Sequence, residues 1–305
     1  MLNIQHLTKT YGDKKAVDDL TLHIAPGEIY GFIGHNGAGK TTTLKSVVGI
    51  LQFDAGTITI DGTDLKADPL ACKRKLAYIP DNPDLYDYMT GIKYLSFIAD
   101  VFGVDAQTRQ ARIRQYGDIF EITGDLAQPI AAYSHGMKQK LAIIAAWLHD
   151  PRLIIMDEPT TSLTDPEIEK VFTILRQLRE QQVGIVFISH KLREVMEICD
   201  SYTVLRDGVM VASGSVKDVT TSDLARFMVG HDVRTEKLDS GAQRGEERLS
   251  LHGVTQEPYF RNVDLTAYAG EVLGVTGLLG DGRSELFSAV FGAETISEGE
   301  IRLGG

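Results

Sequence analysis

A loop able to hold phosphate groups lies near the start of this 305-residue sequence. It fits the pattern G-x-x-x-x-G-K-[ST], after a strand-like apolar run and before a helix-like stretch. Glycines in such a loop let backbone N–H groups surround phosphates, and the helix start adds partial positive charge. Lys40 would then reach the terminal phosphates and Thr41 would ligate magnesium. The candidate nucleotide-binding residues in this loop are Gly34, His35, Asn36, Gly37, Ala38, Gly39, Lys40, Thr41 and Thr42.

Two acidic residues, Asp157 and Glu158, follow a second apolar run. One carboxylate at a strand end near the phosphate loop can hold magnesium, and another beside it can polarise water for attack on a phosphate. Acidic pairs also end strands simply because the chain emerges into solvent there. Together with the phosphate loop, the pair predicts a metal ligand at Asp157 and a general base at Glu158.

Short apolar runs rich in β-branched residues predict the strands that must position these groups. They do not alternate with polar residues, which is typical of strands buried on both faces. The runs span 29–33, 152–156 and 184–188. Residues 166–180 place apolar side chains on one helical face, and Thr164 with Glu167 predicts a capping box before it. The alternation of strands and helices predicts an α/β fold around a largely parallel sheet.

The composition is that of an ordinary globular protein, with 43% hydrophobic and 24% charged residues. The net charge of -11 argues against binding to nucleic acid through phosphate neutralisation. Two cysteines, Cys72 and Cys199, are too few for a disulfide framework.

The longest apolar run, 141–148, is far short of the roughly 20 residues of a membrane-spanning helix. No secretory signal is recognisable, so we expect a cytosolic location.

The sequence contains an internal repeat. Residues 26–34 (PGEIYGFIG) match 269–277 (AGEVLGVTG), an offset of 243, and the same offset joins 56–62 to 299–305. Between the copies, the charged and glycine-containing stretch 235–248 has the composition of a linker. We therefore predict a first domain at 1–234, a linker at 235–248 and a truncated second copy at 249–305.

The second copy carries an altered phosphate loop at 277–284. Arg283 stands where the first copy has lysine, and Asp281 puts a negative charge where phosphates would lie. No Asp-Glu pair follows within the sequence. We therefore expect that this segment neither hydrolyses ATP nor folds stably alone.

With these motifs in place, the first domain resembles the nucleotide-binding domain of ABC (ATP-binding cassette) transporters, which bind ATP with Mg²⁺. The family's signature, usually LSGGQ, is represented by YSHGM at 133–137, about 20 residues before Asp157. The resemblance implies that Ser134 and Gly136 meet the γ-phosphate of ATP bound to a second nucleotide-binding domain. It also implies a phosphate-loop NTPase fold with a helical subdomain, here at about 82–132.

The resemblance implies further roles for three residues. Tyr11 precedes the phosphate loop at the spacing of the family's adenine-stacking aromatic, and His190 matches the switch histidine that contacts the γ-phosphate. Asp81 stands where the family has a glutamine that senses magnesium and the attacking water, so it keeps an oxygen ligand but adds charge. The helical subdomain would receive a transmembrane permease subunit, and we expect the aromatic cluster Tyr86, Tyr88, Tyr94 and Phe97 to take part.

The two halves of the first domain resemble different transporters. Residues 1–157 are similar to ATPases of exporter-type systems, whereas 158–305 are similar to the tandem ATPases of monosaccharide importers. The duplicated architecture favours an ATPase for sugar import, working with a permease and a sugar-binding protein on the cytoplasmic side of the membrane. An exporter-type ATPase and a non-transport ABC protein, such as a regulator or a translation-type ATPase, are the alternatives.

Overall fold

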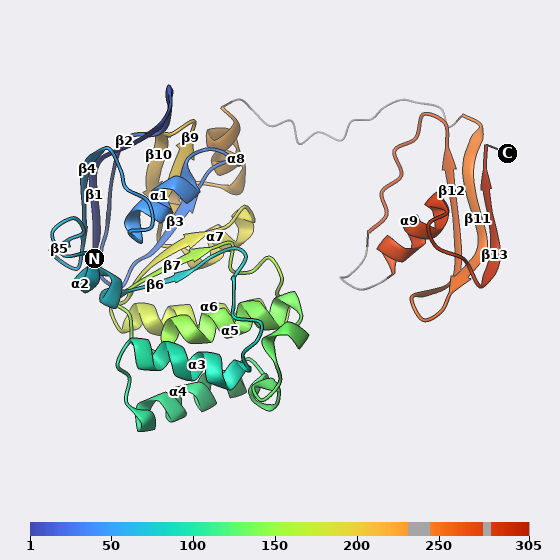
Figure 1. Cartoon of the computed structure of the whole chain (residues 1–305). Helices are drawn as coiled ribbons and strands as arrows, with labels where there is room; N and C mark the ends of the chain where they lie inside the picture. The colour runs from blue at the N-terminus through green and yellow to red at the C-terminus, as the bar shows by residue number, and fades with distance from the viewer. Residues whose placement is uncertain (231–244, 277–281, 305) are drawn as a thin grey trace. The chain divides into compact units, whose positions relative to one another are not determined.

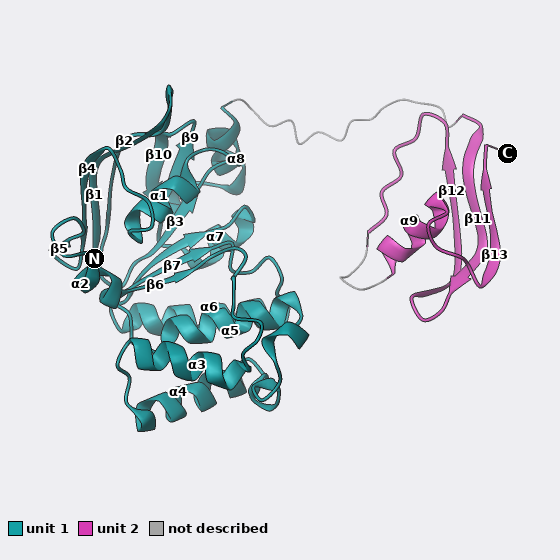
Figure 2. Ribbon diagram, in the orientation of Figure 1, with its two compact units in different colours: residues 1–233 teal, residues 234–305 magenta. Residues whose placement is uncertain are grey.

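The computed structural model describes residues 1–230, 245–276 and 282–304. The chain divides into two compact units, Met1–Val233 and Arg234–Gly305, coloured separately in Figure 2. Across the described part of the chain, no helix has both the length and the apolar character needed to cross a membrane.

Unit 1 is built on two sheets (Figure 1). The first is four-stranded, in the order β2-β1-β4-β5, and the second is six-stranded, in the order β10-β9-β3-β8-β7-β6. The first sheet consists of β1 (Leu2–Tyr11), β2 (Lys14–Ile24), β4 (Ala55–Ile60) and β5 (Thr63–Asp64). The second consists of β3 (Ile29–Ile33), β6 (Leu76–Ile79), β7 (Leu153–Asp157), β8 (Gly184–Ile188), β9 (Ser201–Arg206) and β10 (Val209–Ser215).

Helices cover both faces of the six-stranded sheet. The helices of unit 1 are α1 (Lys40–Val47), α2 (Pro69–Lys75), α3 (Gly91–Val101), α4 (Ala106–Ile119), α5 (His135–Trp147), α6 (Asp165–Glu180), α7 (Leu192–Ile198) and α8 (Thr221–Val229). α1 shares one hydrophobic core with both sheets, and α3 to α8 contribute to a second core against the other face of the larger sheet. Figure 1 shows α3 to α6 gathered on one side of β6 and β7.

The three predicted strands occupy the centre of the six-stranded sheet. β3 and β8 have the predicted bounds, and β7 lies one residue later than predicted. β8 pairs in parallel with β3 on one side and β7 on the other. Ile29 and Ile33 of β3 enter the helical core, whereas Tyr30 and Phe32 enter the core containing α1. Because both faces are covered, these strands lack the alternation of an exposed sheet and carry one charged residue, Asp157 at the end of β7.

α6 forms as the sequence predicts. Its buried positions include the apolar side chains expected on one face: Ile168, Val171, Phe172, Leu175 and Leu178. The Glu167 carboxylate accepts a hydrogen bond from the backbone N–H of Thr164 at 2.9 Å, as expected for a capping box. The cap begins the helix seven residues after Glu158, so the intervening turn is held between a buried strand and a fixed helix start.

Unit 2 repeats part of the arrangement of unit 1. Its sheet has the order β12-β11-β13, and both pairings are antiparallel, as in β2-β1-β4. The elements are β11 (Glu247–Gln256), β12 (Phe260–Tyr268), β13 (Glu298–Leu303) and α9 (Arg283–Phe291). Residues 272–276, which correspond to β3 in the predicted repeat, are not in a strand, and Val272 is 99% exposed. In unit 1 this segment lies between β8 and β9, which have no counterpart among the described residues of unit 2.

Candidate nucleotide-binding site

The phosphate loop connects β3 to α1 and requires glycine at two positions for steric reasons. Gly39 has φ 105°, and a Cβ there would lie 2.3 Å from the backbone oxygen of Ala16. A Cβ on Gly34 would lie 2.3 Å from the backbone oxygen of Leu205. Both contacts are with backbone, which cannot move aside as a flexible side chain would. The loop is therefore fixed in shape by its fit against neighbouring strands.

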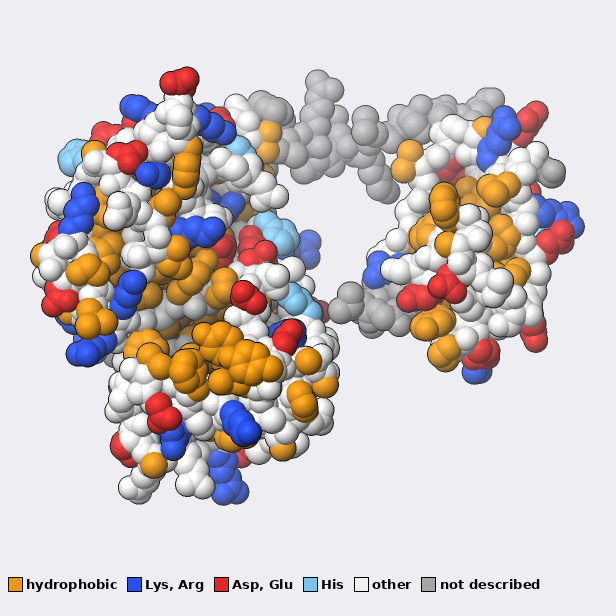
Figure 3. Space-filling model, in the orientation of Figure 1, with side chains coloured by type: hydrophobic (Ala, Val, Ile, Leu, Met, Phe, Trp, Pro, Cys, Tyr) orange, Lys and Arg blue, Asp and Glu red, His pale blue; other side chains and the backbone are white. Residues whose placement is uncertain are grey.

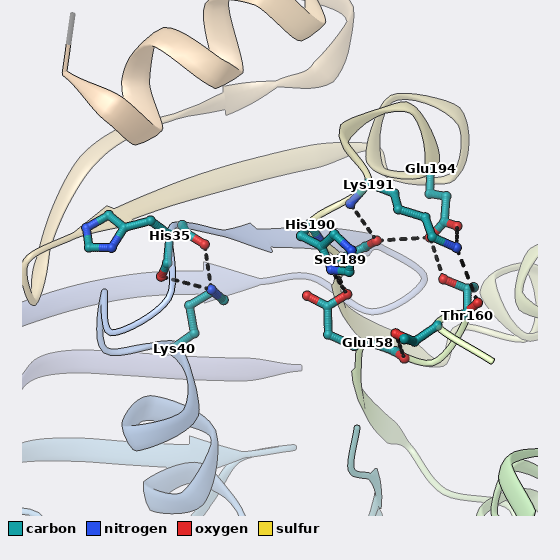
Figure 4. Close-up of polar contacts among 10 residues, drawn as sticks. His35, Lys40, Glu158, Thr160, Ser189, His190, Lys191 and Glu194 are labelled. Carbon is teal, nitrogen blue, oxygen red and sulfur yellow. Dashed lines mark hydrogen bonds and ion pairs between the residues drawn. The ribbon is translucent and has the colours of Figure 1, made fainter. Parts of the chain in front are cut away.

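Lys40, the first residue of α1, bonds back to the beginning of the phosphate loop. Its Nζ donates hydrogen bonds to the backbone oxygens of Gly34 at 2.5 Å and His35 at 3.2 Å (Figure 4). Burial lowers the pKa of Lys40, and the negative charges of Glu158 and Asp157 oppose that effect. The ammonium group is thus held over the loop, in the position from which it could reach a bound phosphate.

Asp157 ends β7 and is buried, at 9% exposure. Burial is the main cause that raises its pKa to about 6, and the nearby charges of Glu158 and Asp81 act in the same direction. The positive charge of Lys40 opposes this rise. A carboxylate that is costly to ionise in the free protein is suited to accept a cation, because the cation would remove the electrostatic penalty.

Glu158 and His190 meet although they are 32 residues apart. The register of the parallel strands pairs Asp157 with Ile188, so the next residues of β7 and β8 emerge at the same edge of the sheet. Glu158 Oε2 lies 2.8 Å from His190 Nδ1 and also accepts the backbone N–H of His190 at 3.2 Å. Figure 4 shows the two side chains facing one another. Glu158 has φ 50°, a conformation uncommon in residues other than glycine.

Most of the predicted nucleotide-binding residues line one pocket of about 390 Å³ in unit 1. Its lining consists of Tyr11, Lys14, Ala16, Asn36, Gly37, Ala38, Gly39, Lys40, Thr41, Thr42, Asp81, Asp157 and Glu158. Gly34 and His35 are not in the lining, and His35 instead places its Nε2 3.5 Å from Asp207. The pocket is polar at the loop and acidic opposite it, an arrangement suited to phosphates with a cation.

The signature residues lie away from this pocket. Ser134 caps α5, with its hydroxyl accepting the backbone N–H of Met137 at 3.2 Å, and its side chain is exposed. Gly136 lies so close to the turn after β7 that a Cβ would come within 2.8 Å of the backbone oxygen of Ser162. Tyr133, which replaces the family's leucine, is buried and donates its hydroxyl to the backbone oxygen of Asp125 at 2.8 Å. Within this chain, therefore, the signature does not touch the phosphate loop.

Two of the residues assigned on the resemblance lie at the mouth of the pocket. Tyr11 lines it and is 52% exposed, with the Lys9 ammonium 5.5 Å from its ring centre. Asp81 also lines it and is exposed. Both side chains are therefore accessible to a ligand entering the pocket.

Sequence reasoning missed Lys14 and Ala16, which line the pocket from the start of β2. Lys14 could have been noted in the sequence as a cation close to Tyr11, but its spacing from the phosphate loop does not mark it as a nucleotide-binding residue. The altered phosphate loop of the predicted second copy spans 277–284, and residues 277–281 lie outside the described residues, so only its last part can be described. There Gly282, at φ 85°, precedes Arg283 at the start of α9.

The pKa of Asp157 leads to a prediction about stability. The folded carboxyl keeps its proton to about pH 6, against 3.8 as the ordinary value. The folded state then binds more protons than the unfolded state between these values, so the free energy of unfolding falls as pH rises through that window. Asp157→Asn should leave stability nearly unchanged near pH 4. It should raise the free energy of unfolding by about 3 kcal/mol at pH 7.5, since the rise from 3.8 to about 6 spans roughly 2 pKa units, each worth about 1.4 kcal/mol.

Urea denaturation in EDTA, without nucleotide, at pH 4, 5, 6 and 7.5 measures this difference. Asp84→Asn, at an exposed position, serves as the control and should show no gain at any pH. A pH-independent difference between Asp157→Asn and the wild type would contradict the assigned cause.

The fold and the pocket define a phosphate-loop nucleotide-binding domain. The family model described as "ABC transporter" matches residues 17–161, from β2 through the turn after Asp157 and Glu158. A solved structure titled "Structure of ATP binding subunit of ABC transporter" superposes with a TM-score of 0.69 at 31% identity. The match covers 79% of this chain and 97% of that one. The chain belongs to the ABC transporter ATP-binding family, whose members bind ATP.

Two relatives match over the full length of this chain. Ribose import ATP-binding protein RbsA of Lacticaseibacillus paracasei is 31% identical over 310 residues, and D-allose import ATP-binding protein AlsA of Escherichia coli is 35% identical over 319. In both cases the match takes in 100% of this chain and 62% of the relative. The chain thus spans less than two thirds of the length of these relatives.

Proposed function

We propose that this chain binds and hydrolyses ATP to power an ABC transporter that imports a simple sugar. The observation that carries the proposal is the single pocket in which the phosphate loop faces Asp157 and Glu158. Hydrolysis needs a cradle for the phosphates, a cation ligand and a base within reach of one another. The cradle is the loop between β3 and α1, and Asp157 and Glu158 lie at the end of β7, separated from β3 by β8 in the same sheet.

The donor set fits Mg²⁺ held jointly with a nucleotide. Asp157, Asp81 and the Thr41 hydroxyl present oxygen atoms to the pocket, and Mg²⁺ is usually held by one or two carboxylates together with phosphates and water. The described residues contain no group of three or more His, Cys, Asp or Glu that would hold a metal alone. The phosphates would therefore complete the coordination, and the ion would neutralise charge between them.

Glu158 is the proposed general base. Its carboxylate borders the pocket and is held by His190, so it is aimed rather than free to rotate. It would accept a proton from water attacking the γ-phosphate, while Lys40 and the loop N–H groups stabilise the charge that develops on the phosphate oxygens. His190, exposed beside it, would contact the γ-phosphate. Tyr11 would stack against the adenine ring.

A second nucleotide-binding domain would complete the site. Ser134 and Gly136 are exposed or near the surface and lie apart from the pocket of their own domain. In a head-to-tail pair, these residues of one domain would meet the γ-phosphate held by the other. The N-terminus of α5 would then present its partial positive charge to that phosphate.

The groove between the six-stranded sheet and the helical layer is the proposed docking site for a permease subunit. It has a volume of about 250 Å³ and is lined by β6, the segment after it, α3 and α5. Beside it, Tyr86 packs against Tyr88, Tyr94 and Phe97 with ring centres 5.8–6.0 Å apart, and Tyr88 is 81% exposed. Figure 3 shows hydrophobic side chains gathered on this face. An exposed aromatic patch beside a groove would accept an apolar helix from a membrane subunit, on the cytoplasmic side of the membrane.

Import of a sugar is supported by the relatives named above, both of which are sugar import ATP-binding proteins. Their similarity extends over residues 1–157, where the motifs resemble exporter-type ATPases. The substrate itself would be selected by the permease and a sugar-binding protein. Import is therefore favoured over the exporter-type and non-transport alternatives.

The test is ATP turnover by the chain with and without membrane subunits of a sugar importer. We expect turnover to rise severalfold when the permease and a sugar-loaded binding protein are present in liposomes. Sugar should accumulate on the side of the membrane that carries the ATPase, opposite to the binding protein. Tyr88→Ser should keep the basal turnover and lose most of the stimulation, because Tyr88 does not line the nucleotide pocket but lies on the proposed docking face.

Val209→Ser provides a matched control, since it removes an exposed apolar side chain of β10 outside the groove. It should leave stimulation intact. Absence of turnover in every condition would refute the ATPase assignment, whereas turnover stimulated only by an exporter-type membrane protein would refute import.

A further inference from the structure

A buried carboxylate behind the site, Glu194, has no role in the functions described so far. It lies on α7 and is 8% exposed. Its Oε2 accepts hydrogen bonds from the hydroxyls of Thr160 at 2.7 Å and Ser189 at 3.0 Å. A carboxylate at this depth is retained only where hydrogen bonds compensate for its loss of water. The arrangement is therefore a fixed bridge rather than a surface contact.

The two residues joined by this bridge flank the proposed base and its partner. Thr160 follows Glu158 by two positions in the turn after β7. Ser189 directly precedes His190 at the end of β8. Glu194 thus ties together, from behind, the two backbone segments that bring Glu158 and His190 within 2.8 Å of one another. Figure 4 shows the bridge and the Glu158–His190 contact side by side.

Lys191 reinforces the same bridge. Its Nζ lies 3.1 Å from Glu194 Oε1 and donates to the backbone oxygen of Thr160 at 3.3 Å. Its backbone N–H donates to the Ser189 hydroxyl at 3.1 Å. Both oxygens of the Glu194 carboxylate are therefore engaged, and each segment is held at more than one point.

We propose that Glu194 is a positioning residue that fixes Glu158 and His190 in their hydrolytic geometry by bridging Thr160 and Ser189. This inference rests on the proposed ATPase function. Loss of the bridge would let the two strand-end turns move independently, and small displacements of a base from its water are enough to slow proton transfer. Nucleotide binding would be spared, because none of the bridging residues lines the pocket.

The experiment compares steady-state ATP turnover and ATP affinity for Glu194→Ala and Glu194→Gln. We expect Glu194→Ala to lower kcat about tenfold or more while KM and the Kd for a fluorescent ATP analogue change by less than about threefold. Glu194→Gln should recover most of kcat, because its amide oxygen can still accept both hydroxyls. Glu197→Ala, an exposed glutamate on the same helix, is the matched control and should behave as the wild type.

If Glu194→Ala does not fold, as judged by its melting transition, the double variant Thr160→Val with Ser189→Ala decides instead. It removes both donors, and kcat should fall with ATP affinity retained. Normal kcat in a folded variant, equal losses in Glu194→Gln and Glu194→Ala, or a loss of ATP affinity that accounts for the effect would each overturn the inference. An inactive wild-type protein would instead refute the proposed function.

Discussion

Replacing Glu158 with glutamine is expected to reduce ATP turnover by about 10²-fold to 10⁴-fold, the usual contribution of a general base. Glutamine has nearly the same shape, and its amide oxygen can still accept a hydrogen bond from His190. It cannot take a proton from water. ATP binding should persist, because the loop and Lys40, which would hold the phosphates, are unchanged.

Phosphate release measures the turnover of the Glu158→Gln protein, and titration with a fluorescent ATP analogue measures its affinity. Glu180→Gln makes the same chemical change at an exposed position at the end of α6 and should leave both quantities unaltered. Turnover within about threefold of the wild type would refute Glu158 as the base. Equal losses of affinity and turnover would instead show that Glu158 acts in binding.

The centre of the fold could be predicted from the sequence because local pattern and tertiary environment agree there. The apolar runs at β3 and β8 have their predicted bounds, since a strand covered on both faces leaves a continuous signal. The phosphate loop is a local motif, and the glycines that define it are also those that backbone contacts require. The helix at α6 carries both its apolar face and its cap in consecutive residues.

Features that depend on contacts between distant segments could not be predicted in this way. The contact of Glu158 with His190 arises from the register between β7 and β8, which no spacing in the chain reveals. In the sequence, Glu194 looks like any other charged residue of an amphipathic helix. Only its burial and its hydroxyl partners in the structure distinguish it from the exposed glutamates. At residues 272–276 the sequence instead predicts an element that the structure does not contain. They match β3 in sequence and form no strand, because a central strand needs neighbours on both sides.

Replacing Lys40 with methionine is expected to weaken ATP binding about 10²-fold. Methionine keeps an unbranched chain of similar length but has no charge, and hydrogen bonds to charged groups are worth about 1.5–3 kcal/mol each. The loss should be compounded by Asp157 and Glu158, whose negative charges would then face the phosphates without the opposing ammonium. Since a ligand stabilises the fold by RT ln(1 + [L]/Kd), the melting temperature should rise with ATP in the wild type, and Lys40→Met should need about 10²-fold more ATP for the same rise.

Thermal melts with increasing Mg-ATP test this directly, and Lys73→Met, an exposed lysine on α2, is the matched control. Lys40→Arg adds a discriminating comparison, because Arg283 occupies the corresponding position in the predicted second copy. Arginine keeps the charge but spreads it over a planar group, whereas lysine donates to the backbone oxygens of Gly34 and His35 from a single compact ammonium group. We expect Lys40→Arg to bind ATP more weakly than the wild type. If it bound as tightly, the arginine of the second copy would no longer be a reason to expect weak nucleotide binding there.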